Sequence, residues 1–397
     1  MKFQAQMIIT PSELDKKLKF NEQSLQVGVY FHYPFCRKKC PYCHFYSYHG
    51  EKKDHDLWWQ TIQREINLLA GEMAARMEID TVYFGGGTPS SLRPEEIEQL
   101  LARLGENFNC NLKEITLEFN PGSHTPKLAG FKQAGINRLS LGAQSFSEKI
   151  LKILGRLHSV EDIFAAASEA RKAGFKNLNL DLMIGLPGED ESTFEANILG
   201  IKAIGPEHLS VYMLEELDEV PFKQILEQNP VSEDRLVETY ERYQETLSEL
   251  GYKQYEISNY SRPGFSCRHN LKYWEYQPVI GFGPSAASHL AFNRWQNVSD
   301  LKLWAEAILE GKLNLSELLI LSPEAVLKEK LMSGLRLAAG VDWELIKEEY
   351  PGLDFFPYEE RIRELSAAGC LEMSGSKLRI PSGRFLVTNS ILGELLF

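Results

Sequence analysis

The sequence has no long hydrophobic run: no stretch approaches the roughly 18 apolar residues that mark a membrane-spanning helix. The N-terminus, MKFQAQMIITPSELDKKLKF, also lacks an apolar segment followed by a small-residue cleavage site, as a secretion signal would have. These two absences predict a cytoplasmic protein without a membrane span. Thiols stay reduced in that compartment, so six cysteines among 397 residues do not predict a disulfide framework.

Basic residues are also in deficit. The chain has 43 Lys and Arg against 55 Asp and Glu, which gives a formal net charge of −12. Binding to nucleic acid depends on a basic surface that displaces counterions, so this composition argues against a nucleic-acid partner. The sequence shows no repeat with a period of about 20–50 residues and no low-complexity tract, so a repeat architecture is not indicated.

Six short segments rich in β-branched and aromatic residues predict strands, and segments with helical periodicity lie between them. Because each strand is nearly continuous in apolar residues, we expect a parallel sheet covered by helices, in an open or barrel-like α/β fold. The predicted strands are residues 26–32, 80–87, 114–120, 137–144, 177–185 and 208–214, and the predicted helices are 56–77, 94–104, 125–134, 147–154, 160–173 and 192–204.

Polar residues and glycines gather just after these strands. A cysteine-rich loop follows the first strand, and Gly85-Gly86-Gly87-Thr88-Pro89 follows the second. The third, fourth and fifth strands carry Glu118, Gln144 and Asp181 at or near their ends. The carboxyl ends of parallel strands meet at one edge, where α/β folds place their chemistry. The sequence therefore predicts a single site at that edge.

The pattern loosens after residue 214. Residues 232–250 predict a long helix, and 252–260 predict a seventh strand. The last part of the chain is mostly helical and contains a hairpin around Gly375, which predicts a small winged-helix-like module. We expect four divisions: an N-terminal extension (1–25), a barrel (26–260), a connecting segment (261–300) and a C-terminal helical, winged-helix-like domain (301–397).

Three cysteines, Cys36, Cys40 and Cys43, stand close together in CRKKCPYCHF, and Phe45 occupies the place of a fourth. Three thiolates suit a [4Fe–4S] cluster whose fourth iron keeps an open position for a small chelating ligand. A zinc site completed by His32 or His44 is the alternative, and the spacing alone leaves both open. The other cysteines, Cys110, Cys267 and Cys370, are scattered and are interpreted as small apolar residues.

The motif CRKKCPYC, preceded by VYFHYPF and followed by YFGGGTPS, resembles the radical S-adenosylmethionine superfamily. Further segments, LEFNPG, RLSLGAQSF, LGRLHS, DLMIGLPGE and CRHNLKYW, resemble its coproporphyrinogen dehydrogenase-like branch, and within it the heme chaperones. This resemblance runs from about residue 27 to the C-terminus. It implies a partial (β/α)6 barrel and a [4Fe–4S] cluster, held by Cys36, Cys40 and Cys43, that binds and cleaves S-adenosylmethionine.

The resemblance also implies ligand contacts. Those to S-adenosylmethionine are Tyr30, Tyr42, Gly86, Gly87, Thr88, Glu118, Gln144, Arg156 and Asp181. It further implies that His269, in HNLKYW, is an axial ligand to heme, with Tyr273 and Trp274 offering flat apolar surface. On physical grounds alone, Glu118 and Asp181 could be capping residues at strand ends, and a histidine among aromatic residues is more often structural.

Three positions bear on the family resemblance: one distinguishes two groups within the family, and two differ from most of its members. Phe45 stands where coproporphyrinogen dehydrogenases have a fourth cysteine, as it does in the heme chaperones. His44 stands where relatives often carry aspartate. In GFGPSAASH, Ala287 replaces a histidine of the relatives, and His289 follows two residues later, so the local geometry of this stretch is in doubt.

These observations predict a heme chaperone that binds a [4Fe–4S] cluster, S-adenosylmethionine and heme, and that passes heme to heme-requiring client proteins, respiratory ones in particular. One alternative is an oxygen-independent coproporphyrinogen III oxidase using a 5′-deoxyadenosyl radical, against which Phe45 and the HNxxYW stretch argue. A radical enzyme acting on tRNA is disfavoured by the acidic charge. Enzymatic activity, a homodimer and peripheral association with a membrane surface are left open.

Overall fold

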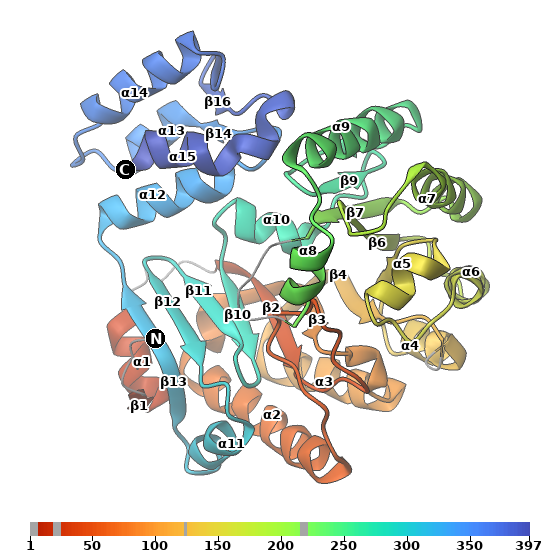
Figure 1. Ribbon diagram of the computed structural model, residues 1–397. Coiled ribbons are helices and arrows are strands. Elements are labelled where there is room, and N and C mark those ends of the chain that lie inside the picture. Colours follow the sequence, from red (N-terminus) through yellow and green to blue (C-terminus); the bar gives the residue numbers. More distant parts are fainter. Residues whose placement is uncertain (1–6, 19–24, 123–124, 215–220) are drawn as a thin grey trace.

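The computed structural model describes residues 7–18, 25–122, 125–214 and 221–397. Six parallel strands form its centre and follow one another across the sheet in chain order (Figure 1). They are β2 (Leu25–Tyr33), β3 (Met77–Gly86), β4 (Asn109–Phe119), β5 (Arg138–Gln144), β6 (Leu178–Ile184) and β7 (His208–Met213). All six predicted strands are thus present, and the α/β fold with a partial (β/α)6 barrel is confirmed.

Helices connect these strands, as the periodicity predicts. Local capping sets their ends: Asp190 accepts a hydrogen bond from the Thr193 amide at the start of α7, and Gly205, with φ of 57°, ends that helix. The helices between the strands are α2 (Lys52–Met73), α3 (Pro94–Asn107), α4 (Leu128–Gln133), α5 (Glu148–Ile153), α6 (Val160–Lys172) and α7 (Glu191–Ile204). None of the helices in the described residues is long and apolar enough to cross a membrane.

The sheet is wider than the sequence predicts, with 13 strands among the described residues. Strand β10 (Val279–Phe282) pairs in parallel with β2, and antiparallel strands extend the sheet beyond it. These are β11 (Ala287–Leu290), β12 (Asn293–Asn297), β13 (Leu313–Ile320) and β1 (Met7–Ile9), and α1 (Pro11–Leu18) follows β1. The sequence does not reveal β11 and β12 because strands of four and five residues joined by a tight turn show little periodicity, and it does not reveal β1 because its partner β13 lies far along the chain.

The prediction of one seventh strand at 252–260 is wrong. This segment forms a hairpin of β8 (Lys253–Gln254) and β9 (Asn259–Ser261), and β9 pairs antiparallel with β7. Glu256 turns the chain, because its side chain accepts a hydrogen bond from the Ser258 amide at 3.0 Å. Before the hairpin lie α8 (Lys223–Gln228) and the predicted long helix, α9 (Glu233–Glu249).

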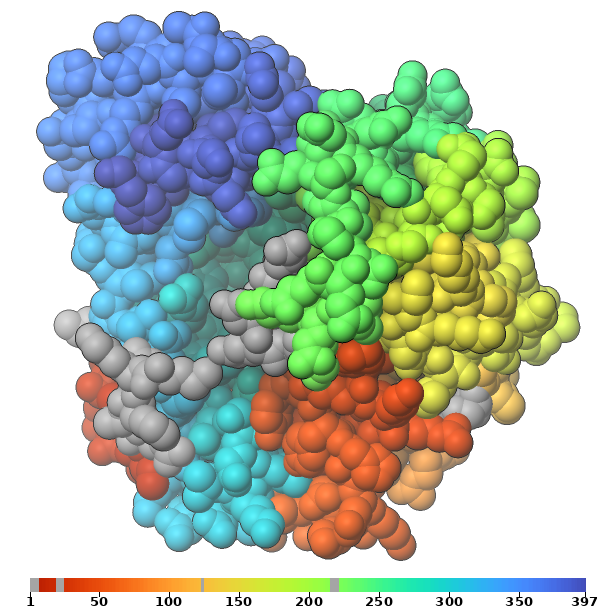
Figure 2. Space-filling view, in the orientation of Figure 1, coloured from red at the N-terminus to blue at the C-terminus, as the bar shows by residue number. Residues whose placement is uncertain are grey.

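The C-terminal residues form a helical lobe at one end of the molecule, drawn in blue in Figures 1 and 2. It contains α12 (Pro323–Gly334), α13 (Trp343–Glu349), α14 (Phe356–Ala367) and α15 (Thr388–Leu396), with a small sheet of β14 (Val341–Asp342), β16 (Lys377–Arg379) and β15 (Glu372–Ser374). The predicted hairpin around Gly375 joins β15 to β16. Residues 301–320 instead give α11 (Leu301–Leu309), which contacts α2, and strand β13 of the large sheet. The domain boundary at residue 301 stays a prediction.

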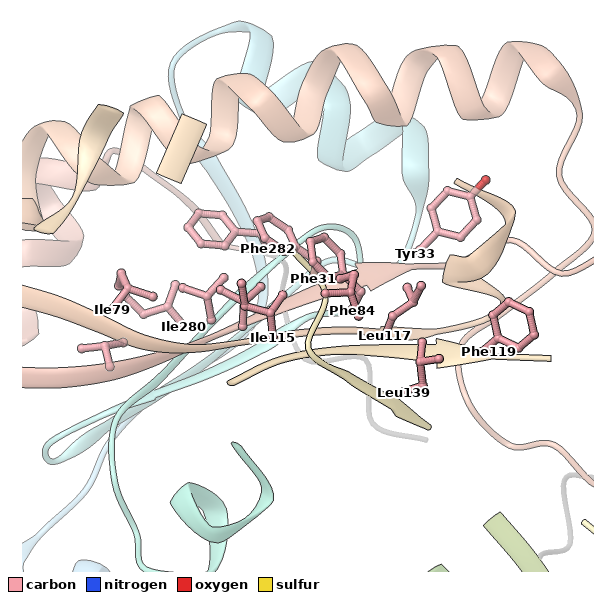
Figure 3. Close-up of a cluster of buried hydrophobic side chains, with 14 of the residues drawn as sticks. Phe31, Tyr33, Ile79, Phe84, Ile115, Leu117, Phe119, Leu139, Ile280 and Phe282 are labelled. Atoms are coloured by element: carbon pink, nitrogen blue, oxygen red, sulfur yellow. The ribbon is translucent and has the colours of Figure 1, made fainter. Parts of the chain in front are cut away.

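The two faces of the central strands differ in chemistry. Phe31, Phe84, Leu117 and Phe282 point to the outer face, where they pack beneath α2 (Figure 3). Because side chains alternate along a strand, their neighbours point to the inner face. That face carries buried or half-buried polar groups, namely Tyr30, Tyr83, Glu114, Glu118, Arg138, Ser140, Asn179, Asp181 and His208. The barrel interior is therefore polar, and it is the inner wall from which the site is built.

Candidate functional site

A cavity of about 720 Å³ opens at the carboxyl ends of β3 to β7, beside the cysteine segment. All but two of the residues that the sequence marks for the site lie on its wall: Cys36, Cys40, Tyr42, Cys43, Gly86, Gly87, Thr88, Glu118, Gln144, Arg156 and Asp181. The volume lies within the range of small-molecule sites, about 300–1,000 Å³. The fold thus gathers side chains from five βα units at the predicted edge.

The cysteine segment is fastened to the end of β3. The Gly87 amide donates to the Tyr33 carbonyl at 2.7 Å, and the Thr88 amide donates to the Phe35 carbonyl at 2.9 Å. On the other side, the Cys36 amide donates to the Tyr48 carbonyl at 2.9 Å. These backbone bonds fix where the loop leaves the sheet and so hold the three thiols over the cavity.

The glycines after β3 allow this close approach. A Cβ atom at Gly87 would lie 2.7 Å from the Phe35 carbonyl oxygen. A Cβ atom at Gly86, where φ is +109°, would lie 2.8 Å from the His32 ring. The sequence suggests that bare backbone serves a ligand, whereas in the structure it first makes room for the cysteine segment itself.

Polar groups surround the sulfurs. Thr88 Oγ1 donates to Cys36 Sγ at 3.5 Å, and Asn120 Nδ2 donates in turn to Thr88 Oγ1 at 3.2 Å. Arg156 Nη1 lies 3.8 Å from Cys40 Sγ. Burial raises the pKa of the Cys36 and Cys43 thiols, which favours their protonated forms. Hydrogen-bond donors and a bound metal would counter this effect and favour the thiolates.

His32 is poorly suited to be the fourth ligand of the alternative zinc site. The Tyr30 hydroxyl pairs with its Nδ1 at 3.0 Å, and the Tyr46 carbonyl pairs with its Nε2 at 2.8 Å. Both ring nitrogens are therefore engaged, and burial lowers the pKa of His32 to about 4. Within the described ranges, no group of three or more His, Cys, Asp or Glu side chains is arranged around one metal ion. In a cubane [4Fe–4S] cluster each thiolate binds a different iron, so the three sulfurs do not need to converge on one metal ion.

Arg156 reaches the cavity wall from the loop after α5. Its Nη2 donates to Asn120 Oδ1 at 2.5 Å and to the Gly142 carbonyl at 2.9 Å. Its Nε is buried and has no hydrogen-bond partner among the described residues. A guanidinium with a spare donor can bind the carboxylate of a ligand.

Two buried acids, Glu118 and Asp181, stand in the depth of the same cavity. Glu118 accepts hydrogen bonds from the Tyr83 hydroxyl at 3.0 Å and from the Gly86 amide at 3.2 Å. Burial, and next the charge of Asp181, raise the pKa of Glu118 to about 8. Burial likewise raises the pKa of Asp181. A cationic ligand between them would relieve this repulsion, so the cavity suits an ammonium or sulfonium group.

Comparison with known proteins agrees with this geometry. Residues 30–198 match the Radical SAM superfamily, and residues 321–386 match the HemN C-terminal domain. The protein "Heme chaperone HemW" of Bacillus subtilis is 31% identical over 378 residues, covering 93% of this chain and 99% of that protein. HemW of Mycobacterium tuberculosis (strain H37Rv) is 32% identical over 377 residues, with 93% and 94% covered. The solved structure of coproporphyrinogen III oxidase (HemN) from Escherichia coli superposes with a TM-score of 0.85 at 22% identity, covering 98% of this chain and 94% of that one.

The chain belongs to the radical SAM superfamily, in the HemN-like family close to HemW.

Radical SAM membership implies a [4Fe–4S] cluster and S-adenosylmethionine, and the residues present fit both. Cys36, Cys40 and Cys43 supply three soft ligands at one wall of the cavity. The spare donor of Arg156 and the buried acids Glu118 and Asp181 offer complementary partners for an amino acid that carries an added positive charge. The individual contact residues remain predictions.

Tyr30 lies outside the cavity wall that the radical SAM resemblance assigns to it. Its hydroxyl is bound to His32, and its ring lies 6.2 Å from that of Tyr83, which does line the cavity. Tyr30 therefore supports the wall from behind. A direct contact with S-adenosylmethionine stays a prediction that this conformation does not favour.

His269, the second residue off the wall, is held in the interior by its neighbours. It lies in the first turn of α10 (Arg268–Trp274) and is 1% exposed. Nδ1 pairs with Thr81 Oγ1 at 3.0 Å, and Nε2 pairs with the Tyr273 hydroxyl at 3.4 Å. Burial, and next the charge of Lys272, lower the pKa of His269 to about 3. Axial ligation of heme through Nε2 would require the ring to give up Tyr273 and to become accessible, so this conformation favours the structural interpretation of His269.

His289, the displaced histidine of the GFGPSAASH stretch, also lies off the cavity wall. Its Nε2 pairs with the Ala291 carbonyl at 3.1 Å and its Nδ1 with the Gln277 carbonyl at 3.4 Å. By contrast, several wall residues are not among those that the sequence marks for the site. They are Arg37, Lys38, Lys39, Tyr83, Ser140, Gly142, Leu157, His158, Tyr212 and Met213. Eight of them stand inside the motifs that carry the family resemblance, and Tyr212 and Met213 end β7, so these positions were the signals that could have indicated them.

Proposed function

We propose that this protein is a heme chaperone, which binds a [4Fe–4S] cluster, S-adenosylmethionine and heme and delivers heme to heme-requiring client proteins, respiratory ones in particular. The observation that carries the proposal is the near-complete coverage by relatives named as heme chaperones, at 31% and 32% identity. The structurally similar coproporphyrinogen oxidase is only 22% identical.

The cysteine segment supports the same choice. Phe45 stands where the oxidases carry a further cysteine, and its side chain is 58% exposed on the cavity wall. An exposed aromatic ring beside the three thiols suits an apolar ligand at the mouth. When bound, the cluster would supply one electron for cleavage of S-adenosylmethionine. The chain's own part is to hold the thiols and to engage the amino-acid end of S-adenosylmethionine.

Coproporphyrinogen III oxidation is the second candidate, favoured by the superposition with HemN over 98% of this chain. The two functions separate in one experiment on anaerobically reconstituted, full-length protein. Hemin is titrated in, and its transfer to a heme-free respiratory cytochrome is followed by absorbance. A parallel sample receives S-adenosylmethionine, a reductant and coproporphyrinogen III.

Stoichiometric hemin binding with transfer, and no protoporphyrinogen, is the expected result. Turnover of coproporphyrinogen III would overturn the proposal, as would hemin that binds but cannot be passed on. The Cys110→Ala variant serves as a control, because Cys110 lies in β4 and does not line the cavity.

A further inference from the structure

One histidine differs from the others in the described residues. The chain has nine histidines, of which His124 lies outside the described ranges. Seven others have at least one ring nitrogen paired with a protein group: His32, His49, His55, His158, His208, His269 and His289. His44 is exposed. Among the described residues, its ring stacks on that of Phe45, with 4.6 Å between the ring centroids. Neither of its ring nitrogens has a hydrogen-bond partner in the part of the chain that the structure describes, so both are open to an outside ligand.

His44 also has the right place. It lines the cavity next to Cys43, and the apolar residues around that mouth are unusually exposed. Phe45 is 58% exposed, Leu157 63% and Met213 38%, and all three belong to the cavity wall. Exposed apolar side chains that converge on one opening mark a binding site for a flat apolar ligand.

The exposed charges at the cavity mouth are positive, whereas the net charge of the chain is negative. Arg37, Lys38 and Lys39 are exposed and line the cavity, although the net charge is −12. Among the described residues of the wall, the acids Glu118 and Asp181 are buried, and Asp162 accepts a hydrogen bond from the Ser159 amide at the start of α6. Lys39 Nζ donates to the Phe45 carbonyl at 3.0 Å, which braces the segment that carries His44. Within the described ranges the side chains of Arg37 and Lys38 pair with no acid, so both cations are open to a dianionic ligand.

We infer that heme binds at this mouth with His44 as the axial ligand to its iron and with Arg37 and Lys38 bound to its two propionates. This assignment rests on the proposed function. A neutral imidazole donates a nitrogen lone pair to the iron, and no group is oxidised, reduced or transferred. The apolar ring faces Phe45, Leu157 and Met213, while the carboxylates remain at the solvent edge with the cations.

The test compares His44→Ala with His49→Ala in cluster-loaded, full-length protein. His49 is exposed on the same segment but lies off the cavity wall. Hemin is titrated against each variant, and difference spectra and electron paramagnetic resonance report the axial ligand. We expect His44→Ala to lose the imidazole signature and to bind hemin at least tenfold more weakly, whereas His49→Ala matches the wild type. Iron and sulfide content verifies that the cluster is retained.

Metal-free protoporphyrin IX has no iron for a histidine to bind. It therefore distinguishes loss of the axial ligand from a change in the shape of the binding site. Its affinity should be equal in wild type and His44→Ala; an equal loss for both porphyrins would overturn the ligand role. Retention of the wild-type hemin spectrum in His44→Ala, or loss of the imidazole signature in folded His158→Ala or His269→Ala, would overturn it too.

The propionate contacts are tested with hemin and its dimethyl ester. Replacing Arg37 and Lys38 by glutamine should weaken hemin binding about tenfold and leave the ester unaffected, and a parallel loss for both would contradict the charge pairing. Wild-type protein that binds no hemin would defeat the proposed function itself. Wild-type binding that is unchanged in His44→Ala would defeat only the present assignment.

Discussion

Lys272 Nζ lies 2.9 Å from Asp80 Oδ1, and this ion pair joins the helix of the HNLKYW stretch to strand β3. The two side chains are 3% and 10% exposed. The ammonium also donates to the Gln26 carbonyl at 3.4 Å and to Gln277 Oε1 at 3.3 Å. Among the described residues, no donor reaches Asp80 Oδ1 with hydrogen-bond geometry, so charge attraction holds this ion pair. The HNxxYW stretch thus fastens α10 to the barrel.

Breaking this pair should destabilise the protein. Lys272→Ala would leave the Asp80 carboxylate buried without its counter-ion, which typically costs about 3–5 kcal/mol of the free energy of unfolding. Urea denaturation followed by circular dichroism measures the change. Lys53→Ala, which removes the exposed partner of Glu51, should leave the midpoint unchanged. The double variant Asp80→Asn/Lys272→Met should recover part of the loss; no recovery would mean that the lysine acts through packing alone.

Cys40→Ala should abolish the cluster. The protein reconstituted without air is expected to be brown, and the variant should lose that colour together with bound iron and sulfide. Cys110→Ala should keep them, because Cys110 lies outside the cavity wall. Zinc in place of iron and sulfide in the wild-type protein would show that the site is of another kind.

Gly87→Ala should displace the cysteine segment. The added Cβ would meet the Phe35 carbonyl oxygen at 2.7 Å, and overpacking of this kind costs about 1–3 kcal/mol. We expect a lower melting temperature and reduced iron per chain after reconstitution. Gly105→Ala is the matched control: it lies in α3 with no atom within 4 Å of the added Cβ, and the change should stabilise that helix by about 0.5–1 kcal/mol. Full iron loading of Gly87→Ala would contradict the steric argument.

Glu65 should make stability depend on pH. This buried carboxyl of α2 binds the Gly283 amide, Asn297 and Trp304, yet burial raises its pKa from 4.5 to about 7. Between these values the folded protein binds more protons than the unfolded chain, so its contribution is full below pH 4.5 and declines as pH rises to 7. The decline is on the order of 3 kcal/mol. Unfolding curves of Glu65→Gln across this window should lack that component; an identical slope would refute the assignment.

Glu118 should make the affinity for S-adenosylmethionine depend on pH. The pKa of its carboxyl is about 8 in the empty cavity, so the group is largely neutral below that pH. A cationic ligand prefers the carboxylate, and affinity should therefore rise as pH increases toward 8. Calorimetry in buffers of different ionisation enthalpy would show proton release on binding. Glu118→Gln should flatten the profile, Glu98→Gln on the exposed face of α3 should not, and a flat wild-type profile would exclude the role.

Much of the fold could be predicted because its signals are local. Each βα unit has a strand and a helix of its own periodicity, and the special residues follow each strand directly. The topology of a parallel sheet then brings residues such as Cys36, Glu118 and Asp181 to one edge. The short strands β11 and β12 were missed because four or five residues carry too little periodicity, and β1 was missed because its partner β13 lies far along the chain.

The sequence by itself determined the six central strands, the three-cysteine segment and the family resemblance, because these depend on spacing and periodicity within a few tens of residues. Only the tertiary structure decided how individual histidines are used. Packing buries His269 against Thr81 and Tyr273 and engages both nitrogens of His32, whereas it leaves the ring of His44 open at the cavity mouth. Hydrogen-bond occupancy is a property of neighbours brought together by folding, and no local pattern encodes it.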